Sequence, residues 1–186
     1  MRLPFALLVL LAAPALAAPS DYVLEPEAST VGFSTDFGQN QITGRMPVAQ
    51  ADLTLDFDKV GNSKVMVVLD VAHAKANFPF AADAMKGVTV LDAKAYPTIR
   101  FESTSVKADG DGARVKGNLT IRGVTHPVTM AARIFRQDGR AKGDFSHLTI
   151  QMTGAVNRSA FGATGWADMV GDEVRLDIIA RVARVE

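Results

Sequence analysis

Apolar residues alternate with polar ones in many short segments of this chain. The pattern is clearest in ADLTLDF (51–57), VMVVLDV (65–71), LTIQM (148–152) and VRLDIIARV (174–182). Successive side chains of a β-strand point to opposite faces, so each such segment forms a strand with one apolar face. Glycine-containing turn signals separate the segments. Many short strands, each apolar on one side, predict an all-β fold: an antiparallel barrel or sandwich.

One pair of these segments predicts a hairpin. In GNLTIRGVTHPVTMAA (117–132), Leu119 and Ile121 alternate with polar residues before a break at Gly123, and Val128 and Met130 alternate after it. The two apolar faces must cover a filled core, a partner or a cavity.

The first seventeen residues have the features of an export signal. Residues 1–17 contain an early positive charge at Arg2, an apolar run and a small-x-small end, Ala15-Leu16-Ala17. This pattern predicts a signal peptide that is cleaved before Ala18. A membrane anchor is the alternative, but the apolar run is too short to span a hydrocarbon core of ~30 Å. We expect residues 18–186 to form a single exported domain without a stable membrane span.

The charge balance and the cysteine count exclude several classes of protein. The chain has 20 basic and 20 acidic residues and no Cys. Removal of residues 1–17 takes away one charged side chain, that of Arg2, so the mature net charge is close to zero. Such a chain lacks the positive patch that nucleic acid or an anionic surface requires. Without Cys no disulfide forms, and stability must come from burial.

One stretch between the middle strands departs from the alternation. Residues 77–97 have an alanine-rich, helix-favouring composition at 80–86 and again at 91–95, and Pro97 ends the second piece. We expect a short helical excursion that caps one end of a barrel. Its apolar side chains form either a lid or the plug of a core, and both remain open: Phe78, Phe80, Met85 and Val88.

Several segments resemble a known family. YVLEPEASTVGFS (22–34), YPTIRFEST (96–104), VKGNLTIRGVTHPV (115–128) and VNRSAFG (156–162) followed by VGDEVRLDI occur in the order that is typical of the YceI-like family. Members of this family are periplasmic proteins with a lipocalin-like antiparallel β-barrel that holds an isoprenoid or a similar long lipid. The resemblance covers residues 22–182 and implies a barrel of about eight strands and a periplasmic location. It also allows a homodimer.

The chain departs from the family pattern at two places. Residues 81–85, Ala-Ala-Asp-Ala-Met, stand where the family commonly has Arg-Asp-x-His-Leu. The His often found before the Ser of the first strand is replaced, since this chain has the pair Ala28-Ser29. Both changes remove polar groups that could meet a head group, so the head group preference of the family is not carried over.

The apolar faces predict what a barrel of this kind would hold. An eight-stranded barrel is wide enough to be filled by side chains or to hold one small ligand. Each buried methylene contributes roughly 0.8 kcal/mol, so a long tail can bind without a polar anchor. The candidate inward-facing residues are Val31, Phe33, Leu53, Leu55, Val67, Leu69, Phe101, Leu119, Ile121, Met130, Leu176 and Ile178.

The segment VNRSAFGATGW (156–166) has two interpretations. The resemblance places Arg158 at the family's Arg, where its planar guanidinium could bind a quinone carbonyl or a diphosphate head group. Alternatively, Arg158 pairs with a carboxylate and braces a bulged strand end. Phe161 and Trp166 either gate a lumen or close the barrel.

Catalytic signals are sparse. His73, His126 and His147 are the only histidines and fall in different strands or turns, with His126 expected in a turn. Three histidines could hold a catalytic zinc ion, but their spacing gives no ligand pair, and no Gly-x-Ser-x-Gly segment supports a hydrolase. We therefore predict a binding protein, not an enzyme, that carries or stores an isoprenoid quinone or polyprenyl lipid, with no other cofactor. The alternatives are a metal-dependent hydrolase and a packed-core stress or interaction protein without ligand.

Overall fold

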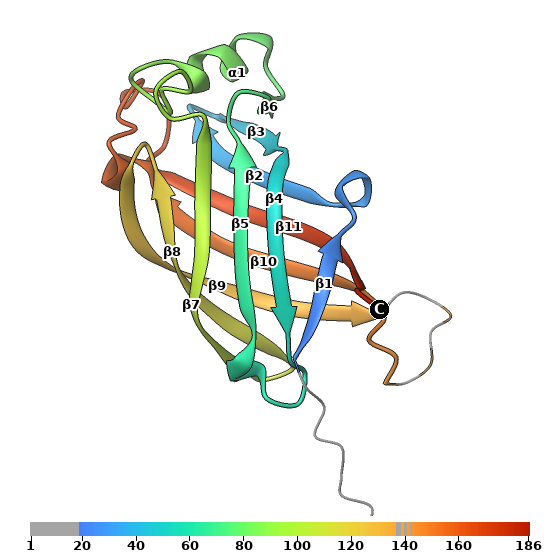
Figure 1. The fold of residues 1–186 in the computed structure, drawn as a ribbon. Helices are drawn as coiled ribbons and strands as arrows, with labels where there is room; N and C mark the ends of the chain where they lie inside the picture. Colours follow the sequence, from blue (N-terminus) through green and yellow to red (C-terminus); the bar gives the residue numbers. More distant parts are fainter. Residues whose placement is uncertain (1–18, 137–138, 140, 142) are drawn as a thin grey trace, which may run out of the picture.

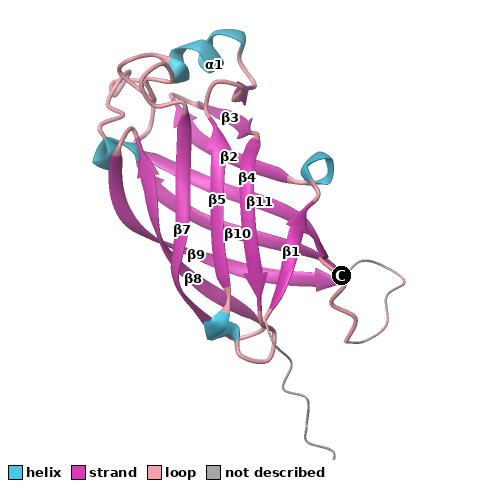
Figure 2. Cartoon of the chain, viewed as in Figure 1, coloured by secondary structure: helices cyan, strands magenta, loops and turns pink. Residues whose placement is uncertain are grey.

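Antiparallel strands close into a barrel of eight, as the sequence predicts (Figures 1 and 2). The computed structural model describes residues 19–136, 139, 141 and 143–186, and the predicted signal peptide lies outside them. The ring follows the order β1-β4-β5-β7-β8-β9-β10-β11, and β1 pairs with β11 to close it. Its strands are β1 (Ser20–Leu24), β4 (Val48–Leu55), β5 (Lys64–Asp70), β7 (Thr98–Asp109), β8 (Gly112–Ile121), β9 (Val124–Arg136), β10 (His147–Asn157) and β11 (Glu173–Arg184).

Three more strands extend the sheet from β11. This last strand pairs with β1 near its carboxyl end and with β2 (Thr30–Phe37) over 175–179. The strand β2 pairs with β3 (Asn40–Met46), and β3 pairs with the short β6 (Lys75–Ala76). Thus β1 completes the barrel wall at one end of β11, and β2 and β3 complete it at the other.

The predicted hairpin is confirmed, with a tight turn between β8 and β9. The two turn residues, Arg122 (φ 52°) and Gly123 (φ 74°), both have left-handed backbone conformations. A two-residue turn of this kind matches the right-handed twist of the strands. The prediction that His126 lies in a turn is wrong: it lies within β9, opposite Leu119. The two-residue turn is shorter than the sequence suggests, so the strand starts earlier.

The first of the two predicted helical pieces is confirmed, and the second is not. The helix α1 (Pro79–Lys86) matches the first predicted piece. The second piece, predicted at 91–95, is wrong, because these residues form hydrogen-bonded turns. Asp92 has a φ of 47°, a left-handed conformation that interrupts a right-handed helix. The Asp92 carbonyl instead accepts the N–H groups of Ala95 and Tyr96 in a compact turn.

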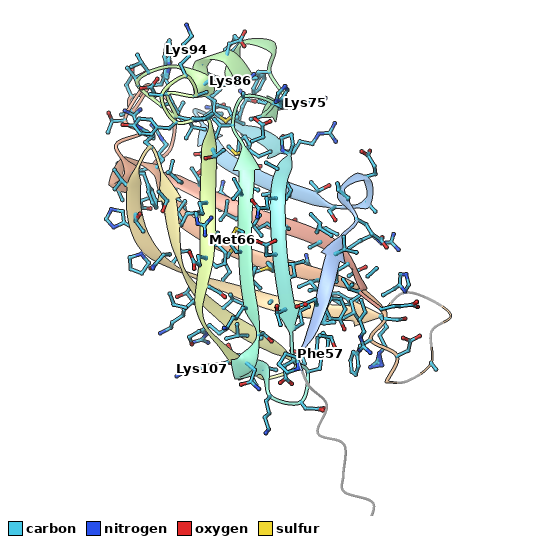
Figure 3. All side chains as sticks on the ribbon, in the orientation of Figure 1. Phe57, Met66, Lys75, Lys86, Lys94 and Lys107 are labelled. Carbon is cyan, nitrogen blue, oxygen red and sulfur yellow. The ribbon has the colours of Figure 1, made fainter. Side chains whose placement is uncertain are left out.

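The two ends of the barrel differ, and we name them by their residues. The lid end carries α1, the following segment 87–97 and the segment 158–172, which begins with η3 (Arg158–Phe161). The plug end carries η2 (Val60–Asn62) together with Phe57 and Phe145, and η1 (Pro26–Ala28) links β1 to β2 on the side of the barrel. Figure 1 shows α1 lying across one end of the barrel, and Figure 3 labels Phe57 at the opposite end. The described residues contain no helix long and apolar enough to cross a membrane.

Candidate functional site

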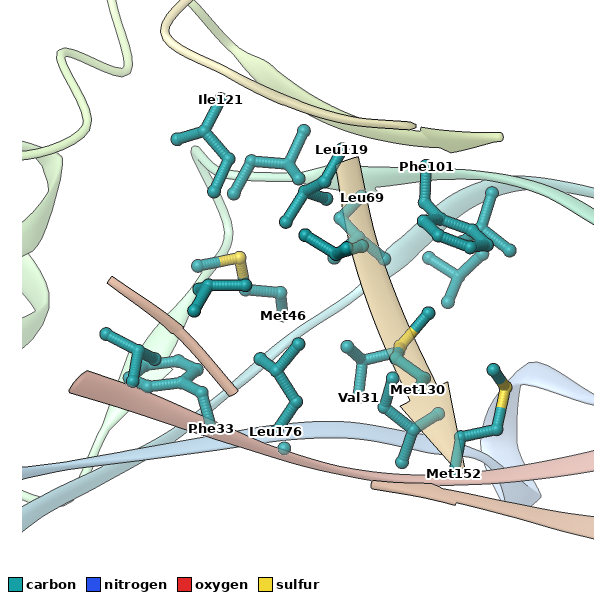
Figure 4. Close-up of a pocket in the computed structure, with 18 of the residues that line it drawn as sticks. Val31, Phe33, Met46, Leu69, Phe101, Leu119, Ile121, Met130, Met152 and Leu176 are labelled. Atoms are coloured by element: carbon teal, nitrogen blue, oxygen red, sulfur yellow. The ribbon is translucent and has the colours of Figure 1, made fainter. Parts of the chain in front are cut away.

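The barrel encloses a cavity of about 380 Å³ between its two ends. This volume lies in the range of ligand pockets in proteins, roughly 300–1,000 Å³. Figure 4 shows Leu69 and Leu119 from one wall facing Val31 and Leu176 from the other. The alternation that defines the strands therefore gives the cavity its apolar lining, because every second residue of each strand points inward.

Most of the predicted ligand-binding residues line this cavity. They are Val31, Phe33, Leu53, Leu55, Val67, Leu69, Phe80, Met85, Phe101, Leu119, Ile121, Met130, Arg158, Phe161, Trp166, Leu176 and Ile178. Phe78 does not line the cavity, since its ring packs between those of Phe37 and Phe80. The fourth apolar residue of the excursion, Val88, lies exposed at the surface. Whether the lining residues bind a ligand stays a prediction.

Sequence reasoning missed part of the lining. Val65, Ile150 and Met152 continue alternating segments and could have been chosen by the same rule. Met46 and Met169 lie at a strand end and in a loop, where alternation gives no signal. The cavity wall contains five methionines: Met46, Met85, Met130, Met152 and Met169. Methionine is unbranched and polarizable, so such a wall can adapt to the shape of its contents.

The hydroxyl-bearing and charged side chains on the wall already have partners within the protein. The Ser29 hydroxyl donates to the Glu25 carbonyl (2.7 Å), and the Thr35 hydroxyl lies 2.9 Å from the Glu173 carbonyl. The Ser63 hydroxyl accepts a hydrogen bond from a backbone N–H (3.0 Å). A ligand that enters this cavity therefore meets mainly hydrocarbon.

Asp56 is the one acidic residue on the cavity wall within the described part of the chain, and its carboxylate is held at the plug end. It accepts hydrogen bonds from the backbone N–H groups of Lys59 (2.7 Å) and Asp58 (3.0 Å) and from the Asn62 side chain (2.8 Å). The Lys59 N–H, followed by the Asn62 amide, holds the pKa of the Asp56 carboxyl below its usual range. This carboxylate organises the turn between β4 and β5.

Arg158 is buried at the lid end and bonds to backbone carbonyls. Its guanidinium donates to the carbonyl oxygens of Ala163 (2.6 Å), Gly165 (2.7 Å), Val170 (2.9 Å) and Gly171 (2.9 Å). The interpretation in which Arg158 pairs with a carboxylate is wrong about the partner, because four backbone carbonyls accept its hydrogen bonds. A guanidinium has five N–H donors, which allows Arg158 to make all four hydrogen bonds at once. These bonds hold the segment 158–172 around its side chain.

The lid-end segments are also tied to one another. Arg122 in the β8–β9 turn donates to the carbonyls of Val88 (2.7 Å) and Val90 (2.8 Å). The Gly165 N–H donates to the Thr89 carbonyl (2.8 Å), and a Cβ at position 165 would clash with the Thr89 side chain. Glycine is required at position 165 because the two segments approach so closely.

The plug end is closed by stacked rings. The rings of Phe57 and Phe145 stack with centroids 4.6 Å apart, and Tyr22 meets Phe57 edge to face at 6.0 Å. The Tyr22 hydroxyl donates to the Phe145 carbonyl (2.8 Å). The guanidinium of Arg184 lies 5.8 Å from the Tyr22 ring centroid, within cation–π range. Phe57 also lines the cavity and forms part of its floor.

The histidines do not form a common site. His73 contacts Asp70 (Nδ1 to Oδ2, 2.6 Å), His126 contacts the Ala160 carbonyl (3.0 Å), and His147 lies at the start of β10. No group of three potential metal ligands comes together among the residues that the structure describes.

Comparison with known proteins identifies the family. The family model for the YceI-like domain matches residues 22–182. The chain belongs to the YceI-like family. A UPF0312 protein of Vibrio vulnificus is 30% identical over 171 residues, which cover 88% of this chain and 90% of the relative. A UPF0312 protein of Pseudomonas aeruginosa is 34% identical over 100 residues, 54% of this chain and 52% of the relative.

Two solved structures share the fold. BcnA of Burkholderia cenocepacia has a TM-score of 0.75 at 24% identity, over 87% of this chain and 99% of BcnA. The YceI protein of Campylobacter jejuni has a TM-score of 0.60 at 22% identity, over 76% of this chain and 84% of that chain. At these identities the likeness concerns the fold alone, and what the cavity can hold depends on the residues of this chain.

Proposed function

We propose that this YceI-like protein is an exported carrier or store that binds one long-chain apolar lipid, of the isoprenoid quinone or polyprenyl type, inside its barrel. The observation that supports this most is the cavity of about 380 Å³, whose wall is apolar and whose polar side chains are held by protein partners. Membership of the YceI-like family supports the same ligand class. Export through residues 1–17, with a periplasmic destination, belongs to this proposal.

The energetics favour an apolar tail over a small polar ligand. Each methylene moved from water into such a cavity contributes roughly 0.8 kcal/mol. Association costs several kcal/mol, about 4–15 kcal/mol in different treatments. A tail of a dozen or more carbons therefore exceeds the lower part of that cost without any polar anchor. We infer a binding role and no catalytic one, since the wall offers hydrocarbon where chemistry needs polar groups.

Mass spectrometry of an organic extract tests this proposal directly. The protein is purified from the periplasm of its native host, and the extract is compared with that of an exported protein of similar size. We expect one dominant long-chain lipid at close to one molecule per barrel. A protein that arrives empty and also takes up neither added quinones nor added polyprenols would contradict the carrier role.

A further inference from the structure

Apolar side chains surround the cavity opening at the lid end. Phe80 is 62% exposed, Val88 69%, Trp166 53% and Met169 44%. Phe80, Trp166 and Met169 also line the cavity, so the cavity wall extends to the surface at this end. A further exposed lining residue, Ile134, lies apart from them on β9. Exposed apolar groups gathered around an opening are typical of an interaction site.

These side chains belong to one continuous rim, which we define as residues 37–38, 78–80, 87–90 and 165–170. The ring of Phe80 stacks on Phe78 at 6.0 Å, and Phe78 meets Phe37 at 6.1 Å. Phe37 forms a β-bridge with Val170 in the segment that carries Trp166. The hydrogen bond from Gly165 to the carbonyl of Thr89 joins that segment to 87–90. The rim therefore encircles the opening and is fixed by backbone contacts on both sides.

Trp166 holds its half-exposed position at a conformational cost. Its φ of 61° lies in the left-handed region, which is strained for a bulky side chain. Its carbonyl accepts the N–H groups of Met169 and Val170, which fixes this backbone. A large ring that is half exposed and carried on a strained backbone contributes little to the stability of the fold. Such strain is concentrated at functional sites, and tryptophan favours the boundary between water and lipid.

We propose that the rim docks on the surface of a zwitterionic lipid bilayer, with Phe80, Val88, Trp166 and Met169 inserted between head groups. This inference rests on the proposed function, because an apolar ligand resides in membranes and the rim surrounds its entrance. The charges on and beside the rim support a neutral partner, since cationic and acidic side chains nearly balance there. These residues are Lys75, Lys86, Lys94, Arg122 and Arg175 against Asp36, Asp83, Asp92, Asp168, Asp172 and Glu173. Figure 3 labels the three lysines at this end of the barrel.

The chain contains a single Trp, which makes Trp166 a site-specific probe of docking. The purified protein is titrated with phosphatidylcholine vesicles while the fluorescence of Trp166 is recorded. We expect a blue shift, quenching by lipids brominated in the upper acyl chain, and little change between low and high salt. A shift seen only with anionic vesicles and lost in salt would overturn the zwitterionic assignment, as would the absence of any shift.

Matched substitutions locate the contact. Phe80→Asp and Val88→Asp keep Trp166 as the probe, and each should weaken vesicle binding about tenfold or more, because a charge replaces an apolar side chain in the membrane. Phe135→Asp, at a half-exposed position on β9 outside the rim, should leave binding unchanged. Equal effects of all three substitutions would overturn the assignment to the rim. A blue shift that grows with protein concentration in the absence of lipid would show that a second copy covers the rim, and would also overturn it.

A second arm separates this inference from the proposed function. Geranylgeraniol is added from ethanol without vesicles, and its retention by the protein is measured after gel filtration. Retention without vesicle docking rejects the docking surface and leaves the carrier role intact. Docking without retention rejects the carrier role. It also rejects the proposal that the rim docks in order to exchange a lipid with the membrane, because there is then no ligand to exchange.

Discussion

The two ends of this barrel are closed by different means. At the plug end, the strand β1 bridges β4 and β11, and Tyr22 packs edge to face against the stacked rings of Phe57 and Phe145. At the lid end, the closure consists of loops whose backbones are held by the side chains of Arg158 and Arg122. Packed rings stabilise through burial, whereas guanidinium–carbonyl contacts hold segments in place and leave apolar surface exposed. Under the proposed function, the plug end would be a fixed floor and the lid end the side through which a ligand exchanges.

The largest effect that we expect comes from opening the plug. Tyr22 is only 3% exposed, so Tyr22→Ala should lower the free energy of unfolding by about 3–5 kcal/mol, as for other large-to-small core substitutions. Phe80→Ala at the lid end should change it by about 0.5 kcal/mol or less, because the ring is exposed. Urea unfolding of the delipidated variants measures both values. Similar losses at the two ends would mean that the lid is packed as firmly as the plug.

The next effect concerns the lid-end clamp. Arg158→Lys keeps the charge but leaves some of the four carbonyls without a donor, which should cost about 1–3 kcal/mol. Amide hydrogen exchange should accelerate in residues 163–171 and stay unchanged around Tyr22. If Arg158 instead anchors a polar head group, stability will be retained while binding of lipids with a polar head falls and binding of plain alkyl chains does not.

A smaller effect is expected in the space between the two ends. Leu176 lines the cavity and Asp177 is exposed on the opposite face of β11. Leu176→Trp should occupy the cavity, abolish lipid uptake and change the unfolding free energy by less than about 1 kcal/mol, whereas overpacking of a filled core costs about 1–3 kcal/mol. Asp177→Trp should preserve both uptake and stability. The comparison must use delipidated protein, since a bound lipid itself raises the apparent stability.

The smallest effect is confined to acidic pH. The folded-state pKa of Asp56 lies below its ordinary value of 3.8, so its stabilising contribution is complete above pH 3.8 and is lost as the pH falls through the folded-state pKa. Asp56→Asn should therefore lower stability slightly at neutral pH and reduce the loss on acidification. Thermal unfolding at a series of pH values checks this. An unchanged acid limb would mean that other carboxylates control it.

The same contrast between the ends explains what the sequence could predict. The hairpin of β8 and β9 and the inward face of β11 were predictable, because alternation encodes which face is buried. The strands β1 and β3 were not predicted: in β3 only Ile42 and Met46 are apolar among Gln, Thr, Gly and Arg. At the lid end, the sequence did not predict which side of α1 faces inward or which groups Arg158 contacts. Both depend on how the loops pack, and every residue has a backbone carbonyl, so the sequence does not mark which carbonyls bind Arg158.

The pairing of β1 with β11 has a consequence for the order of folding. Tyr22 lies opposite Arg184, so the contact that completes the cylinder joins positions 162 residues apart in the chain. Contacts of such high sequence separation form late and slow the folding rate, because the entropy of loop closure is lost before the pairing stabilises anything. Until then β10, β1 and β2 all lack their shared neighbour, and the apolar interior faces water. We therefore expect the slowest kinetic phase of refolding to report the arrival of β11, and the population that precedes it to be the one most prone to aggregate.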